Sequence, residues 1–241
     1  ACDYDAYVPD LLTGRTFALD GQVAADIADA ADAVRVLNAT SKARGSTATL
    51  ARLLLRAESV ASSKIEGLEV GGRRLLKAEL ERGLGMGTSD VTATEVLANI
   101  ESMRWAVNSL AAEERVSVDH VREVHRRLLE NTRLAHHGGV VRREQNWIGG
   151  SSYNPCAAAF VPPPPDLVIG LLEDLCDFIN DDELSPIAQA AIAHAQFETI
   201  HPFVDGNGRT GRALIYIILR RRGLAPKVVP PVSLVLATWA A

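Results

Sequence analysis

The 241-residue sequence has few cysteines and no excess of positive charge. Its 25 Lys and Arg stand against 30 Asp and Glu, a formal net charge of −5, so generic binding to phosphate backbones or anionic lipid is excluded. The three cysteines, Cys2, Cys156 and Cys176, form no C-x-x-C pair and cannot all pair within one chain. We therefore expect a reducing compartment, with the cytoplasm as the default location.

Long apolar runs are also missing from the sequence. No stretch reaches the roughly 20 apolar residues of a membrane span, and the first ten residues are unlike a signal peptide, so we expect no membrane partner. Hydrophobic residues make up 47% and charged residues 23%, which is the balance of an ordinary globular domain. The chain begins without Met, and residues 224–241 contain no helix-ending signal, so we expect a C-terminal segment that has been truncated.

Helical periodicity dominates the chain and predicts an all-α fold. Between residues 90 and 111, apolar side chains recur every three or four positions: Val96, Ile100, Met103, Val107 and Leu110. Ser117 is typical of a helix N-cap and predicts a helix that runs through Leu134. Three more helices are expected: one after Pro165, one from Pro186 to about Thr199, and one from about Gly208 to Arg222.

Two segments rich in glycine or proline interrupt the helical pattern. Residues 83–90 predict a linker between an N-terminal helical region, residues 1–82, and a main core, residues 91–223. Residues 138–165 cannot hold a long helix and predict a small β-hairpin or lid. We interpret its last four residues, all proline, as a stiff lead into the next helix rather than a polyproline docking ligand.

The chemistry is concentrated in residues 201–212, HPFVDGNGRTGR, which lie between two expected helices. The glycines have the spacing of the dinucleotide fingerprint G-x-G-x-x-G, but an Ala-rich helix precedes them and no acidic residue follows Asp205. They also have the spacing of a P-loop, yet Arg212 and Ala213 stand where Lys and Ser or Thr are required. Both interpretations are therefore rejected.

An anion site is nevertheless expected in this segment. Gly206 and Gly208 let the backbone approach a ligand, and the following helix directs its free N–H groups at the loop. Arg209 and Arg212, three positions apart, share one helix face and can each clamp phosphate oxygens. Two such arginines suit a polyphosphate better than a single carboxylate.

The loop also holds a candidate metal ligand and a candidate base. A free polyphosphate carries Mg²⁺, and Asp205 is the only acidic residue of the loop that can bind it. His201 is the only loop residue that titrates near neutrality, which makes it the candidate general base for a hydroxyl that attacks phosphorus. His194, by contrast, lies in the Ala-rich helix and is expected to be a core residue with its hydrogen bonds satisfied.

HPFVDGNGRTGR matches every fixed position of H-P-F-x-D-G-N-G-R-x-x-R, and on this motif the chain is identified as a member of the Fic family. The resemblance implies a Fic-type helical bundle that transfers AMP from Mg-ATP to a Ser, Thr or Tyr hydroxyl of a protein target. It implies that residues 147–163 form a flap on which the target adds a strand. The implied roles are His201 as base, Phe203 as the loop's anchor in the core, Asp205 as Mg²⁺ ligand, and Gly206, Asn207, Gly208, Arg209 and Arg212 as the phosphate cradle.

A second, shorter match lies in residues 59–67, SVASSKIEG, which resembles the family's inhibitory pattern S/T-x-x-x-E-G/N through Ser62, Glu66 and Gly67. Ser62 and Glu66 are four positions apart and share one helix face, and Gly67 is a reasonable helix stop. The resemblance implies an N-terminal inhibitory helix in which Glu66 pairs with Arg212 and keeps the γ-phosphate out.

The sequence leaves three functions open. An autoinhibited protein adenylyltransferase is the leading interpretation. A de-AMPylating or bifunctional enzyme would use the same site, with Glu66 orienting a water molecule, and a nucleotide-responsive binding module would use it without catalysis. We expect ATP and a protein target as partners and no specific nucleic acid, and a homodimer stays open.

Overall fold

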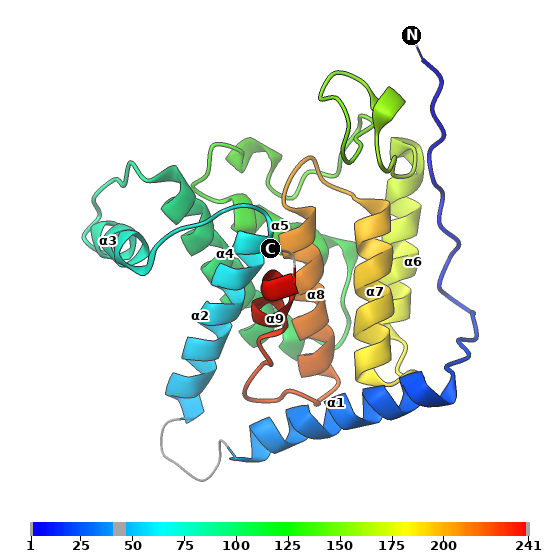
Figure 1. Ribbon diagram of the computed structural model, residues 1–241, viewed down its shortest axis with the longest axis horizontal. Coiled ribbons are helices and arrows are strands. Elements are labelled where there is room, and N and C mark those ends of the chain that lie inside the picture. Colours follow the sequence, from blue (N-terminus) through cyan, green and yellow to red (C-terminus); the bar gives the residue numbers. More distant parts are fainter. Residues whose placement is uncertain (1, 41–46, 240–241) are drawn as a thin grey trace.

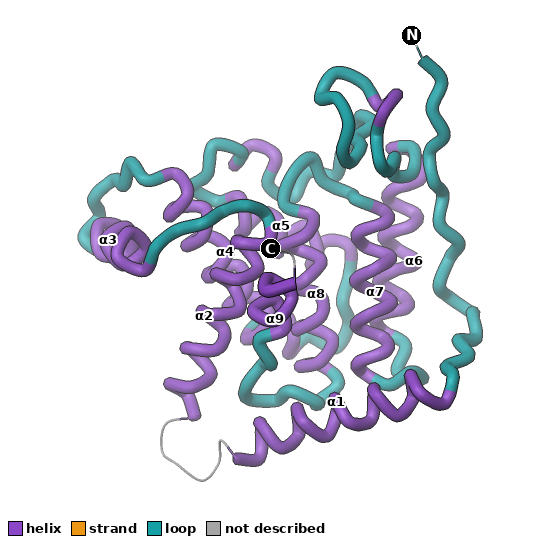
Figure 2. The backbone as a smooth tube through the Cα atoms, in the orientation of Figure 1, coloured by secondary structure: helices purple, strands orange, loops and turns teal. Residues whose placement is uncertain are grey.

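The computed structural model describes residues 2–40 and 47–239 of the chain. Within these ranges the chain forms α-helices, short 3-10 turns and no strand, which confirms the predicted all-α class (Figures 1 and 2). The α-helices are α1 (Gly21–Thr40), α2 (Thr47–Ile65), α3 (Gly72–Gly83), α4 (Val91–Asn108), α5 (Val118–Leu129), α6 (Val168–Asn180), α7 (Pro186–Ile200), α8 (Asn207–Arg221) and α9 (Val232–Trp239). Each of these helices is too short or too polar to span a bilayer.

Helix α8 lies at the centre of the bundle. It packs along α7 and also contacts α4, α5 and α2, while α6 covers the other side of α7 (Figure 1). Its side chains Leu214, Tyr216, Ile217 and Ile218 are completely buried, so α8 is surrounded by other helices along most of its length. Because its first turn follows residues 201–206 directly, the core fixes the position of that loop.

Several helix starts agree with the sequence analysis. Asp90 accepts a hydrogen bond from the N–H of Ala93, and Ser185 accepts one from Ala188 with Pro186 in the first helical position. Ser117 caps α5 as expected, but that helix ends at Leu129 and not at Leu134. The prediction fails there because Asn131 adopts a positive φ of 63°, which is incompatible with a continuing right-handed helix.

Residues 138–165 leave the bundle as a loop with little regular structure. The predicted β-hairpin is not confirmed, because within the described residues this loop forms one antiparallel bridge, between Ile148 and Phe160, and no ladder. Gly149 and Gly150 both have positive φ directly after Ile148. On the other side, prolines 162–165 lack the N–H that a ladder needs.

The chain's first residues run beside this loop and down the flank of α6 and α7 (Figure 1). The N–H of Tyr7 donates to the carbonyl of Val161 at 2.9 Å, and the N–H of Leu12 donates to the carboxylate of Asp174 on α6 at 2.6 Å. Residues 2–20 therefore form an extended strap that ties the loop to the helices below it.

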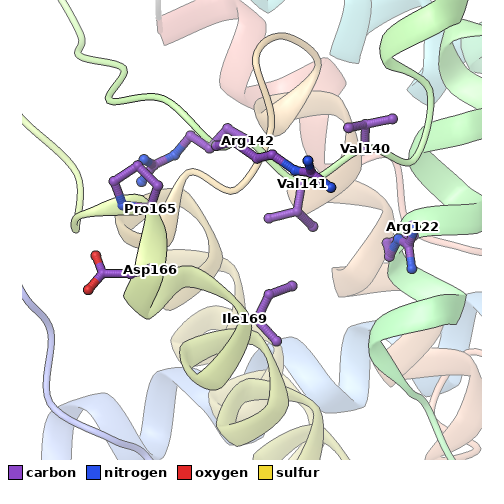
Figure 3. A pocket seen from close by; sticks show the side chains of 8 residues that line it. Arg122, Val140, Val141, Arg142, Pro165, Asp166 and Ile169 are labelled. Carbon is purple, nitrogen blue, oxygen red and sulfur yellow. The ribbon is translucent and has the colours of Figure 1, made fainter.

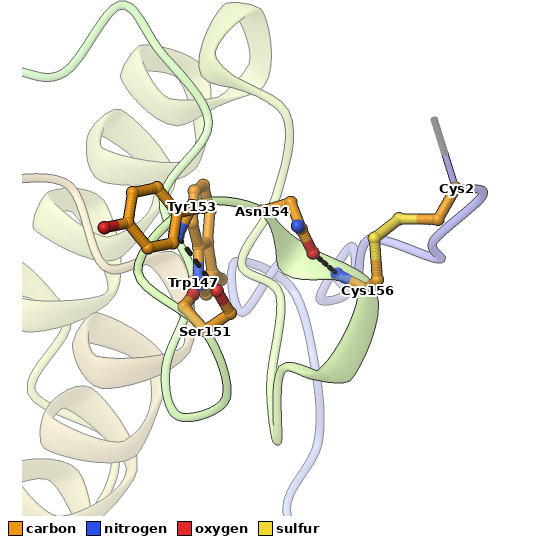
Figure 4. The surroundings of a disulfide bond; sticks show 6 residues. All are labelled: Cys2, Trp147, Ser151, Tyr153, Asn154 and Cys156. Atoms are coloured by element: carbon orange, nitrogen blue, oxygen red, sulfur yellow. Dashed lines mark hydrogen bonds between the residues drawn. A yellow bond between two sulfur atoms is a disulfide. The ribbon is translucent and has the colours of Figure 1, made fainter.

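A disulfide bond between Cys2 and Cys156 joins this strap to the loop (Figure 4). Two of the three cysteines are therefore paired, which weighs against the reducing compartment expected from their spacing, and the cytoplasmic location stays a prediction. Cys176 is free and buried in α6, where burial raises the pKa of its thiol to about 12. Sequence spacing could not reveal the pair, because its members lie 154 positions apart.

The N-terminal helices pack into the same molecule as the core. Helix α2 lies against α4, α8 and α9, and the buried carboxylate of Glu58 on α2 accepts a 2.8 Å hydrogen bond from the N–H of Ser233 in the first turn of α9. Residues 84–90, which fall in the expected linker, connect α3 to α4. The domain boundaries at residues 82, 90 and 223 stay predictions.

Candidate active site

The loop between α7 and α8 turns at two residues with left-handed backbone. His201 has φ 47° and Gly206 has φ 79°. A left-handed conformation is unfavourable for a histidine, so the surroundings must hold it. Arg142 supplies part of this support, because its Nε donates to the carbonyl of His201 at 2.9 Å and its Nη2 donates to the carbonyl of Pro163 at 2.6 Å.

The loop is anchored in the core by Phe203, which is completely buried. Asn207 closes the loop around it, since Oδ1 accepts from the N–H of Phe203 at 2.9 Å and Nδ2 donates to the carbonyl of Phe203 at 2.8 Å. Both polar atoms of this amide are thus engaged by the protein. Asn207 shapes the loop through these bonds, and the free N–H groups of the first turn of α8 are left to face a ligand.

Arg209 is the clearest sign of an anion site. Its side chain is only 3% exposed, and its Nη2 lies 3.2 Å from Oδ2 of Asp205. Its Nε and Nη1 are buried and have no hydrogen-bond partner in the part of the chain that the structure describes. Buried donors of a charged group that lack a partner are costly, so this guanidinium is preorganised for an incoming polyanion.

The carboxylate of Asp205 is 47% exposed beside this arginine. In residues 2–40 and 47–239, no group of three or more His, Cys, Asp or Glu side chains could hold a metal ion with protein ligands alone. The donor set fits Mg²⁺ instead, which is commonly bound by one carboxylate with phosphate and water oxygens completing its shell. Asp205 is the residue that would hold it.

The imidazole of His201 is largely buried, and its Nδ1 has no hydrogen-bond partner among the described residues. Burial lowers the pKa of His201 from its ordinary value, and the backbone carbonyl of Glu198 offsets part of this effect. The lowered pKa favours the neutral ring at pH 7, which is the form that accepts a proton.

Glu66 and Arg212 form an ion pair, as the resemblance implied. Nη2 of Arg212 lies 2.7 Å from Oε1 of Glu66, and the guanidinium also donates to Oγ of Ser62 at 2.8 Å and to its carbonyl at 2.9 Å. Gly67 follows with φ 77°, the left-handed conformation of a helix stop. The carboxyl end of α2 therefore engages the arginine on α8.

Gly208 makes this approach possible. A Cβ at this position would collide with Oε1 of Glu66 and lie 2.9 Å from Nη1 of Arg212. The glycine that the motif requires for a phosphate thus also admits the carboxylate of α2.

A second carboxylate near the site, that of Glu198 on α7, was not expected from the sequence. Its Oε1 lies 3.8 Å from Nδ1 of His194, and a Cβ on Gly211 would collide with it. Burial raises the pKa of Glu198 to about 7, while Arg212 opposes this rise and Glu66 adds to it. Nδ1 of His194 is buried without a hydrogen-bond partner in the described chain, so the expected satisfied core histidine is not found.

The role of Arg142 was not expected from the sequence either, because its bonds reach residues that are distant in the chain. Arg142 lines a pocket of about 660 Å³ between α5 and the start of α6, together with Arg122, Val141 and Ile169 (Figure 3). No residue of 201–212 lines this pocket. Arg142 thus connects the pocket to the loop through its bond to the carbonyl of His201.

Comparisons with known proteins identify the family. Residues 115–219 match the model of the Fic/DOC family, and residues 24–108 match that of the Fic/DOC family N-terminal region. A protein adenylyltransferase fic-1 from Caenorhabditis briggsae is 35% identical over 160 residues, which cover 64% of this chain and 30% of the relative. A protein adenylyltransferase Fic from Drosophila willistoni is 34% identical over 139 residues, or 56% of this chain and 26% of the relative.

Solved structures show the same fold. Fic-1 from Caenorhabditis elegans superimposes with a TM-score of 0.64 at 28% identity, over 89% of this chain and 62% of that one. A Fic family protein from Desulfovibrio desulfuricans gives a TM-score of 0.68 at 23% identity, over 93% of this chain and 65% of that one. The chain spans about a third or less of the curated relatives' length. Its fold, its motif and both matched models nevertheless agree, and the chain belongs to the Fic/DOC family.

Proposed function

We propose that this chain carries the active site of an autoinhibited protein adenylyltransferase, which transfers AMP from Mg-ATP to a Ser, Thr or Tyr hydroxyl of a protein target. The observation that carries the proposal is that three groups lie together in residues 201–212. They are the imidazole of His201, whose lowered pKa favours the neutral form, the exposed carboxylate of Asp205, and the guanidinium of Arg209, whose Nε and Nη1 have no partner among the described residues. The names of the relatives from Caenorhabditis and Drosophila support it.

In this reaction His201 takes the proton of the target hydroxyl as its oxygen attacks the α-phosphorus. The new oxygen–phosphorus bond replaces the bond to the bridging oxygen of the β-phosphate, and pyrophosphate leaves. Asp205 would hold Mg²⁺, which supplies positive charge to the phosphate oxygens. Arg209 and the N-terminus of α8 bind the polyphosphate and hold it in line with the attacking oxygen.

In this proposal Glu66 restrains the nucleotide site. Its carboxylate neutralises Arg212, which would otherwise bind the γ-phosphate, and its charge repels the incoming polyanion. Both effects act in the same direction. The side chain of Glu66 is 36% exposed, so it can also orient a water molecule, and removal of AMP from a modified protein is the second candidate function.

We propose that the target docks along residues 147–163. The base of this flap is joined to the catalytic loop, because Nδ2 of Asn146 donates to the carbonyls of His201 at 3.3 Å and Phe203 at 3.1 Å. A chain that pairs with the flap would therefore lie at a defined distance from His201. The homodimer stays a prediction.

The proposal is tested by incubating the Glu66→Gly variant with a cell lysate and with ATP that carries the label on either its α- or its γ-phosphate. Transfer of AMP labels protein from the α-label alone, whereas a kinase would label from the γ-label. The matched control is the double variant Glu66→Gly with His201→Ala, which should add no α-label to the lysate proteins. Absence of α-labelled protein, or equal labelling by the double variant, contradicts the proposal.

A further inference from the structure

His125 lies on α5 directly beneath the catalytic loop and belongs to none of the motifs found in the sequence. It is completely buried, and both of its ring nitrogens have partners. Nδ1 accepts a 3.0 Å hydrogen bond from the N–H of Gly139, so Nδ1 carries no proton. Nε2 is therefore the protonated nitrogen, and it donates to the backbone carbonyl of Asp205 at 2.8 Å. The protein thus selects one neutral tautomer of this ring.

The ring also contacts the loop on either side of Asp205. It stacks on Phe203 with the ring centroids 3.7 Å apart and the planes inclined by 8°. A Cβ on Gly206 would lie 3.4 Å from the same imidazole. His125 therefore contacts Phe203, the carbonyl of Asp205 and Gly206.

The other partner of the ring is equally well fixed. Gly139 begins the segment that leads to the flap and has φ 74°, and a Cβ there would lie 2.9 Å from the carbonyl of Arg122. Nε of Arg122 donates to the carbonyl of Gly139 at 2.8 Å. The Gly139 N–H thus has a fixed direction, and this direction determines which nitrogen of His125 faces Asp205.

We propose that His125 is a positioning residue for the metal ligand: its Nε2–H holds the Asp205 peptide and so aims the carboxylate into the site that receives Mg-ATP. The inference rests on the proposed function, in which Asp205 binds Mg²⁺. His125 itself touches neither nucleotide nor metal. His125 acts on Asp205 through the single hydrogen bond from Nε2. A substitution can therefore remove this bond and keep the bond at Nδ1, or the reverse.

Two variants each keep one of the two hydrogen bonds of the ring and lose the other. The amide of Asn reaches about as far as Nδ1, so His125→Asn keeps an acceptor for Gly139 and loses the donor to Asp205. The amide of Gln reaches about as far as Nε2, so His125→Gln keeps the donor and loses the acceptor. Both variants lose the stacking on Phe203, so each is the control for the structural cost of the other.

The test measures ATP binding by calorimetry in the Glu66→Gly background, with Mg²⁺ and with chelator, alongside a thermal melt of each variant. We expect His125→Asn to lose about threefold to tenfold in the Mg²⁺-dependent part of ATP affinity, the value of one hydrogen bond, with no change in chelator. His125→Gln should keep most of the Mg²⁺ effect. Asp205→Ala should abolish it.

The outcomes separate the inference from the function on which it rests. An equal loss in both variants, or a loss of the same size with and without Mg²⁺, overturns the positioning role. Retention of the full Mg²⁺ effect by His125→Asn overturns it as well, and leaves the proposed function intact if Asp205→Ala still removes that effect. If the Glu66→Gly parent shows no Mg²⁺-dependent binding of ATP, both the inference and the proposed function fail.

Discussion

At the scale of single residues, burial shifts the pKa of two groups near the junction of α7 and the loop that follows it. Glu198 and His201 lie three positions apart at the end of α7. Burial disfavours the charged form of each group, so it raises the pKa of the Glu198 carboxyl and lowers the pKa of the His201 imidazole. Neither direction can be read from the sequence. The two shifts have different consequences for activity and for stability.

The base assignment predicts that His201→Ala, in the Glu66→Gly background, lowers AMP transfer by about 10²- to 10⁴-fold, the usual contribution of a general base. ATP binding should change little, because other groups hold the phosphates. In the parent, the rate should fall only below the ordinary histidine pKa of 6.5, because the lowered pKa keeps the ring neutral above it. Rates of α-label transfer across pH check both points, and an unchanged rate in the variant contradicts the mechanism.

The raised pKa of Glu198 predicts that the stability of the protein depends on pH. Its pKa in the folded protein is about 7 against an ordinary value of 4.5, so the folded state binds this proton more tightly than the unfolded state. The stability that it contributes is complete below pH 4.5 and is lost as the pH rises through about 7. Urea unfolding across this range should show the loss, and Glu198→Gln should remove it. The exposed Glu183→Gln is the control, and an identical pH slope in wild type and Glu198→Gln contradicts the assignment.

At the scale of elements, the pairing of α2 with α8 is the contact that we propose controls access of the nucleotide to the site. Ser62 and Glu66 use one face of α2 for three hydrogen bonds to Arg212, and α9 packs against α2 as well. Helix α2 is therefore held both by Arg212 on α8 and by α9, the last described helix of the chain. On the proposed function, loss of the Glu66–Arg212 pair alone should release the nucleotide site.

Removal of this pair predicts activation. Glu66→Gly should strengthen productive ATP binding by about one to two powers of ten, since a hydrogen bond to a charged group contributes roughly 1.5–3 kcal/mol. Self-labelling from α-labelled ATP and calorimetric affinity should rise together. Glu69→Gly is the matched control, because Glu69 pairs only with the exposed Lys64. Equal affinity and equal labelling in wild type and Glu66→Gly would falsify the inhibitory role.

At the scale of the whole molecule, the strap of residues 2–20 joins the flap to the far end of the bundle. It is held by the disulfide to Cys156 and by the backbone bond to Val161 at one end, and by Asp174 at the other. Within the flap, Nε1 of Trp147 donates to the carbonyl of Ser151 at 2.7 Å, so the tip has an internal bond as well (Figure 4). The flap is thus restrained by contacts from residues 2–20.

Loss of the disulfide should destabilise the protein by roughly 2–5 kcal/mol, because the bond constrains a long loop of the unfolded chain. Thermal melts of the oxidised wild type and of Cys156→Ser measure the difference. Addition of reductant should lower the melting temperature of the wild type to that of the variant and leave the variant unchanged. A wild type that melts at the same temperature with and without reductant contradicts this pairing.

The sequence by itself determined the helical class, most helix starts and the chemical centre of the protein. These features depend on local patterns: apolar side chains at helical spacing, capping residues such as Ser117 and Ser185, and twelve adjacent residues that form one loop. The resemblance to the Fic family, and not the residues alone, pointed to Ser62, Glu66 and Gly67 as an inhibitory segment and to Arg212 as the partner of Glu66.

Only the tertiary structure decided the contacts between segments that are distant in the chain. The pairing of Cys2 with Cys156, the support of His201 by Arg142 and the bond from His125 to Asp205 all join different elements. Local patterns carry no information on such pairs. The pKa of Glu198 is of the same kind, since it depends on burial, on Arg212 in α8 and on Glu66 in the turn after α2. The sequence therefore identifies which residues form the loop, whereas tertiary packing determines their protonation and their orientation.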